Sequence, residues 1–179
     1  MGYYFQLLRW NKPSGRLILL IPAGWSLWLN PAAPPSLFIF GIIILGGLFV
    51  SSAGCIANDI WDRQFDKKVA RTKERPLANG KVSLRNAWTL LIIFLFLSLL
   101  IVLSIPTDGR TLCLQLASLS LPLILLYPSA KRWFKYPQLI LSICWGFSVL
   151  IPWAASESSL AGGMQLLFCW LATIFWTFG

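Results

Sequence analysis

Long apolar segments alternate along the chain with shorter polar ones. A helix needs about 20 mainly apolar residues to cross a bilayer, and the apolar runs approach or reach that length. They are Arg16–Leu29, Leu37–Ala57, Trp88–Ile105, Leu112–Tyr127, Leu139–Ala155 and Met164–Phe178. The pattern predicts six membrane-spanning helices. The first and fourth are short, and we expect tilt or flanking interfacial residues to complete them.

The composition places most of the chain in lipid. Of the 179 residues, 57% are hydrophobic and only 12% are charged, and the mean hydropathy is +0.70. Soluble domains carry about 25% charged residues. Gly2 to Ser14 is aromatic and basic and shows no cleavage site, so we expect the first helix to be retained. The sequence predicts an all-α, polytopic transmembrane helical bundle that forms a single domain over residues 1–179.

The basic residues gather in every second connecting segment. Of the fifteen Lys and Arg residues, three precede or begin the first apolar run, eight separate the second and third runs, and three separate the fourth and fifth. The other connections contain only Arg110. The positive-inside rule then puts the N-terminus, the basic segments and Gly179 on the cytoplasmic side. Because these bases flank apolar helices, attraction to lipid headgroups accounts for them, and we expect no nucleic-acid partner.

The residue types limit the available chemistry. The chain has no histidine, and its cysteines form no metal-type spacing. A histidine-based triad, a zinc site of the usual kind and a haem-binding histidine are therefore excluded. Asp, Asn, Lys, Arg and Tyr remain. The cysteines lie in separate apolar runs and are expected to be buried: Cys55, Cys113, Cys144 and Cys169.

Oxygen-bearing side chains recur at helical spacing where the second apolar run ends. Asn58, Asp59, Asp62 and Asp66 form the pattern NDxxDxxxD. If the helix continues, all four lie on one face. Such ligands suit Mg²⁺, which commonly bridges protein carboxylates to substrate phosphates. The negative end of the helix dipole also favours a cation there.

Basic residues follow the acidic motif immediately. They could neutralise the phosphate oxygens that a metal leaves free, and Arg can do so in bidentate fashion. The alternative is that Asp62 or Asp66 only forms an ion pair with a neighbouring base at the membrane edge. The number of acids on one face favours the metal. The predicted diphosphate contacts are Arg63, Lys67, Arg71, Lys73 and Arg75.

A second polar group ends the fourth apolar run, on the same side of the membrane. It consists of Tyr127, Lys131 and Arg132. The two bases could simply anchor the helix at the headgroups. In the functional alternative, one base binds diphosphate and the other binds an aromatic carboxylate.

Three segments together resemble a known family. They are NKPSGRLILLIPAGW, NDIWDRQFDKKVARTKERPLANGKVS and LYPSAKRWFKYPQLILSICWGFSVLIPWAA. They are similar to the UbiA superfamily of intramembrane prenyltransferases, and within it to 4-hydroxybenzoate polyprenyltransferases of the cyanobacterial, plastoquinone-pathway type. The resemblance implies a bundle of about nine helices with a lateral opening to lipid and two Asp-rich motifs. We therefore expect six of nine spans here, a C-terminally incomplete domain, and no activity from this chain alone.

The resemblance also implies roles for individual residues. Mg²⁺ is expected on Asn58, Asp62 and Asp66, and Asp59 is expected to share in catalysis with Asp62 and Asp66. Arg132 is the expected contact for the carboxylate. The implied reaction transfers a polyprenyl group from polyprenyl diphosphate to the ring of 4-hydroxybenzoate in quinone biosynthesis. The alternatives are another aromatic acceptor, such as homogentisate or dihydroxynaphthoate, and an ion-coupled transporter, which would favour broken helices and internal repeats.

Overall fold

The computed structural model describes residues 2–12 and 14–179. Within these residues the chain forms seven helices and no strand, which confirms the all-α prediction. The helices are α1 (Gly2–Leu7), α2 (Ser14–Leu29), α3 (Leu37–Asp66), α4 (Leu84–Ser104), α5 (Thr107–Ala130), α6 (Pro137–Glu157) and α7 (Gly163–Phe178).

Each predicted apolar run lies in a helix of its own. By length and composition, α3, α4, α5 and α6 are long and apolar enough to cross a membrane, whereas α2 and α7 are apolar but have 16 residues each. Two helices, α4 and α5, begin four and five residues before their predicted apolar runs. The Ser83 hydroxyl caps α4 by accepting a hydrogen bond from the Asn86 amide, and α5 begins directly after Pro106. Local residues such as the Ser83 cap therefore set these ends, while hydropathy marks only the apolar middle.

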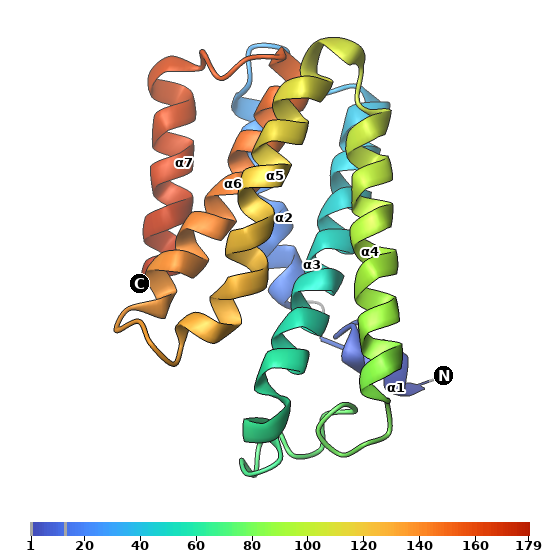
Figure 1. The fold of residues 1–179 in the computed structure, drawn as a ribbon. Helices are drawn as coiled ribbons and strands as arrows, with labels where there is room; N and C mark the ends of the chain where they lie inside the picture. Colours follow the sequence, from blue (N-terminus) through green and yellow to red (C-terminus); the bar gives the residue numbers. More distant parts are fainter. Residues whose placement is uncertain (1, 13) are drawn as a thin grey trace.

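The helices α2 to α7 run up and down through the molecule (Figure 1). The connections 30–36, 105–106 and 158–162 lie at the upper end in that view. The N-terminal segment and the segments 67–83 and 131–136 lie at the lower end, and α7 runs downward to the C-terminus at about mid-height. All three basic segments therefore share one end of the bundle.

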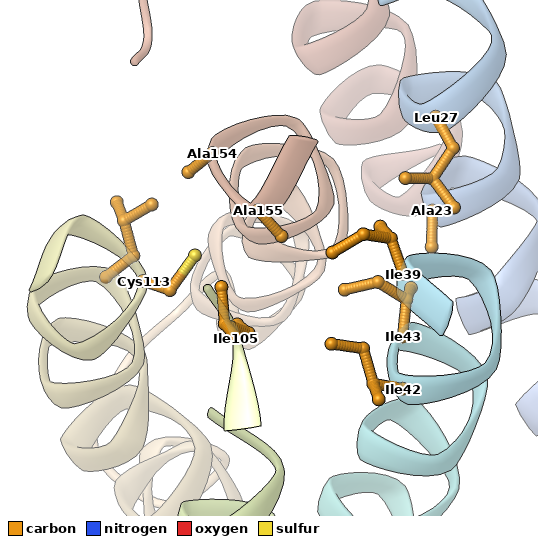
Figure 2. Packing of buried hydrophobic residues seen from close by; sticks show 10 residues of the cluster. Ala23, Leu27, Ile39, Ile42, Ile43, Ile105, Cys113, Ala154 and Ala155 are labelled. Carbon is orange, nitrogen blue, oxygen red and sulfur yellow. The ribbon is translucent and has the colours of Figure 1, made fainter. Parts of the chain in front are cut away.

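Two apolar clusters hold the ends of the bundle together. Figure 2 shows the first, in which Ile39, Ile42 and Ile43 of α3 face small residues of neighbouring helices such as Ala23 and Ala155. The second cluster lies near the basic end. It packs Leu7 of α1, Ile56 of α3, Leu77 and Val82 of segment 67–83, and Leu91 of α4.

The second cluster fixes a segment that has no regular helix. Leu77 is 1% exposed and Val82 is 2% exposed, and burying a Leu or Val side chain contributes about 1.5–3 kcal/mol. Gly80 adopts a φ of 81°, a left-handed conformation that favours glycine, shortly before α4 begins. Segment 67–83 is thereby folded back against α3 and α4.

Candidate active site at the basic end of the bundle

The acidic motif lies on the last turns of α3. The helix continues past its apolar run and ends at Asp66, which is the condition under which the motif residues share a face. Successive positions four residues apart lie close together on a helix face, so Asn58, Asp62 and Asp66 form one row with Asp59 beside it. Bases from three other parts of the chain approach this face.

One edge of the face meets the end of α5. Nζ of Lys131 donates hydrogen bonds to Oδ1 of Asn58 at 2.8 Å and to Oδ2 of Asp62 at 3.0 Å. A guanidinium nitrogen of Arg132 lies 3.7 Å from the other Asp62 oxygen. The structure therefore joins the two polar groups that the sequence predicts separately.

Arg132 is also held by other groups of α3. It donates a hydrogen bond to the Trp61 carbonyl at 2.5 Å, and its guanidinium lies 4.6 Å from the centre of the Phe65 ring, within the range of a cation–π contact. Lys131 and Arg132 follow directly on the last turn of α5, which contains Pro128 and ends at Ala130. The end of α5 therefore places both bases beside Asp62.

The other edge of the face meets the N-terminal segment and segment 67–83. Oδ1 of Asp59 accepts hydrogen bonds from Arg9 at 2.9 Å and from Arg75 at 3.2 Å. The same Arg75 nitrogen donates to Oδ2 of Asp66 at 2.8 Å. Asp59 and Asp66 are only 2% and 7% exposed, whereas the side chains of Arg9 and Arg75 are 38% and 27% exposed, so the carboxylates are shielded from water more than their partners are.

Arg9 is a site residue that the sequence reasoning missed. The pattern assigned it to lipid headgroups, and no spacing rule links residues 9 and 59. Its φ of 55° is unusual for a residue other than glycine, and such a conformation persists only where surrounding contacts enforce it. Burial disfavours the charged form of Arg9, but the nearby Asp59 carboxylate outweighs this effect and raises the pKa of Arg9. Arg9 therefore remains a cation.

Side-chain cations pair with every carboxylate of the acidic face. Three carboxylates face four bases, which are Arg9, Arg75, Lys131 and Arg132. Burying unpaired charges costs several kcal/mol each, so the pairing is needed for stability. Within residues 2–12 and 14–179, no three His, Cys, Asp or Glu side chains converge as a metal site.

The residues nevertheless fit Mg²⁺. Magnesium is usually held by one or two carboxylates together with substrate phosphates, rather than by an all-protein cage. Asn58 and Asp62 already direct one oxygen each at a single cation, the Lys131 ammonium. Both oxygens are hard ligands of the kind that magnesium selects.

The remaining predicted site residues surround this centre. Lys67, Arg71 and Lys73 are exposed on segment 67–83. Arg63 is half-buried, and its Nε has no hydrogen-bond partner among the described residues. The ring of Tyr127 lies 5.3 Å from Nζ of Lys131.

An apolar cavity of about 520 Å³ lies deeper in the bundle, between α2, α3, α4, α5 and α6. On α5 its wall includes Ile124, one turn before Tyr127. Phe96 and Leu99 of α4 and Leu121 of α5 also line it, although all three are exposed on the outside of the molecule. The cavity therefore opens sideways between α4 and α5, the lateral opening that the resemblance implies.

Comparison with known proteins identifies the family. Residues 19–179 match the UbiA prenyltransferase family. The chain is 43% identical to a 4-hydroxybenzoate solanesyltransferase of Synechocystis sp., with 97% of this chain and 57% of that protein aligned. It is 41% identical to a 4-hydroxybenzoate octaprenyltransferase of Legionella pneumophila, with 92% of this chain and 57% of that protein aligned.

Solved structures agree in fold. A UbiA homologue from Aeropyrum pernix K1, solved without ligand, superposes with a TM-score of 0.72 at 27% identity over 98% of this chain and 60% of that one. One from Archaeoglobus fulgidus, bound to DMAPP and Mg²⁺, superposes with a TM-score of 0.75 at 19% identity over 97% of this chain and 59% of that one. The chain thus spans somewhat more than half the length of these relatives. It is an integral membrane protein and belongs to the UbiA prenyltransferase family.

Proposed function

We propose that the protein transfers a polyprenyl group from polyprenyl diphosphate to the ring of 4-hydroxybenzoate, in quinone biosynthesis. The proposal rests on one observation. A charged centre of acids and bases lies at the basic end of the membrane bundle, and next to it is an apolar cavity that opens to lipid. The names of the relatives from Synechocystis and Legionella, which share more than two fifths of the aligned residues, support the choice of acceptor.

The charged centre is suited to bind the diphosphate. Asn58 and Asp62 are the residues that would hold Mg²⁺, with Asp66 on the next turn. The bound metal would neutralise the charge that develops on the leaving diphosphate. Lys131, Arg75 and the exposed bases of segment 67–83 can donate to the phosphate oxygens around it. The Archaeoglobus fulgidus homologue, which was solved with DMAPP and Mg²⁺, supports this assignment.

The apolar cavity is suited to the prenyl chain. Its wall carries almost only hydrocarbon side chains from five helices. Such a wall excludes water, and a reactive allylic cation would otherwise be captured by water before the aromatic ring attacked it. Ile124 and Tyr127 of α5 connect this cavity to the charged centre.

Arg132 is suited to bind the acceptor carboxylate. Its side chain is 39% exposed, and a guanidinium can hold a carboxylate in bidentate fashion. Its contacts with Trp61 and Phe65 keep it beside the Asp62 centre. A carboxylate bound there would place the ring of 4-hydroxybenzoate near the reacting end of the prenyl diphosphate. The positive-inside rule puts this end of the bundle on the cytoplasmic side.

The proposal is tested by Asp62→Ala in the full-length protein, reconstituted in lipid with Mg²⁺, radiolabelled 4-hydroxybenzoate and a long-chain prenyl diphosphate. We expect product formation to fall by at least about a thousandfold, because the leaving group loses a metal contact worth several kcal/mol. Asp108→Ala is the matched control, since Asp108 is an exposed acid at the opposite end of the bundle. Equal turnover by wild type and Asp62→Ala would refute the assignment.

A further inference from the structure

We propose that Asp59 is a positioning residue, which ties Arg9 and Arg75 together and so holds segment 67–83 over the acidic face. In this account Asp59 binds neither the metal nor a substrate. The proposal deepens the proposed function and rests on it for the identity of the ligand. It assigns diphosphate binding, rather than metal binding, as the property that Asp59 controls.

Asp59 is buried and paired with two bases. Its side chain is 3% exposed, and one of its oxygens accepts from both guanidiniums. The bases come from opposite directions along the chain, Arg9 before α2 and Arg75 after α3. Asp59 needs these partners, because leaving a buried carboxylate unpaired is costly.

Arg75 links Asp59 to Asp66. A single nitrogen of its guanidinium lies 3.2 Å from Asp59 and 2.8 Å from Asp66. Asp59 therefore sets where Arg75 lies, and Arg75 in turn fixes the Asp66 carboxylate at the end of α3. Thr72 adds a hydrogen bond from its hydroxyl to the Asp66 carbonyl at 3.2 Å. These contacts close segment 67–83 onto the acidic face.

The N-terminal segment holds Arg9 beside Asp59. Arg9 holds its left-handed backbone conformation between two anchors, Leu7, which is fully buried, and Trp10, which donates to Ser52 at 3.2 Å. The strain shows that the Arg9–Asp59 contact is enforced by packing on both sides. Segment 67–83 bears Lys67, Arg71 and Lys73, so a fixed segment presents three bases to a diphosphate at once.

The experiment compares Asp59→Asn, Arg9→Gln and the double variant with wild type, all reconstituted in lipid. Hydrogen exchange of residues 67–83 reports the position of the segment, and binding of Mn²⁺ and inorganic pyrophosphate reports the two ligands separately. We expect each single variant to speed exchange in 67–83 by about tenfold or more, because each breaks a buried ion pair. Pyrophosphate affinity should fall several-fold while Mn²⁺ affinity stays within about twofold.

The double variant and the control variants test whether the effect is specific to the Arg9–Asp59 pair. Exchange in the double variant should be no faster than in Asp59→Asn, since Asp59→Asn already removes the ion pair that Arg9→Gln breaks. Arg9→Lys should restore part of the protection from exchange. Asp108→Asn should match wild type. Loss of Mn²⁺ binding in Asp59→Asn with unchanged exchange would show that Asp59 is a metal ligand instead. If Asp59→Asn does not fold, unchanged exchange in Arg9→Gln overturns the proposal equally. Because exchange needs no turnover, absence of prenyl transfer by the full-length wild type would refute the proposed function without affecting this one.

Discussion

Each oxygen of the Asp62 carboxylate faces a base from the end of α5. Lys131 lies 3.0 Å from one oxygen and Arg132 lies 3.7 Å from the other. Lys131 also takes the Asn58 oxygen, so it occupies the ligands that would bind a divalent ion. A metal ion on the same oxygens would lie close to the Lys131 ammonium, and two cations at that distance repel each other. We therefore expect metal binding at Asn58 and Asp62 to displace Lys131.

We expect Lys131→Met to change metal binding in opposite directions with and without diphosphate. Without diphosphate, the variant should bind Mn²⁺ about tenfold more tightly, an effect limited by solvent screening of a side chain that is 37% exposed. With pyrophosphate present, affinity should fall, because a phosphate contact is lost. Electron paramagnetic resonance of bound Mn²⁺ measures both quantities.

Lys135→Met provides the control for this prediction. Lys135 is an exposed base in the same connection between α5 and α6, and its ammonium lies over the Tyr136 ring. It should leave both affinities unchanged. Weaker Mn²⁺ binding by Lys131→Met in both conditions would show that Lys131 supports the metal rather than competing with it.

At the scale of elements, hydropathy and helical spacing were sufficient to predict most of the fold. The apolar runs located the helices α2 to α7, and the spacing of NDxxDxxxD predicted a shared face on condition that α3 continues to Asp66, which it does. Neither signal could pair Arg9 with Asp59 or bring Lys131 to Asn58, because those contacts join residues 50 and 73 positions apart. Such pairs depend on how helices pack, and local periodicity carries no information about packing.

Segment 67–83 forms no regular helix, yet part of it packs into the apolar core. Leu77 packs against α3 and α4 and is only 1% exposed. We expect Leu77→Ala to destabilise the closed segment by about 2–5 kcal/mol, the usual effect of a Leu-to-Ala change in a core. Hydrogen exchange of residues 67–83 should then approach that of an open loop, while exchange in α6 stays slow.

Val69→Ala serves as the comparison for Leu77→Ala. Val69 belongs to the same segment but is 47% exposed, so it should leave exchange unchanged. If the two substitutions had equal effects, packing of Leu77 would not be what holds the segment.

At the scale of the whole molecule, the cavity wall combines side chains from five helices around one volume. Ala117 of α5 lines this cavity. We expect Ala117→Phe to fill part of it and to lower kcat/KM for long prenyl diphosphates more than for short ones. Leu103→Phe on the exposed face of α4 adds a ring outside the cavity and should leave the ratio unchanged. Competition between short and long prenyl diphosphates measures the ratio directly.

The size and sideways opening of the cavity also determine where the substrate would come from. Its volume of about 520 Å³ lies in the range of pockets that enclose drug-sized ligands, and a solanesyl or octaprenyl chain is longer than such ligands. The far end of the chain would therefore remain among the lipid tails between α4 and α5 while its diphosphate end reacts. Substrate and product would then exchange by lateral diffusion, without either long chain passing through water. Turnover would follow the mole fraction of prenyl diphosphate in the bilayer rather than its concentration in the surrounding volume.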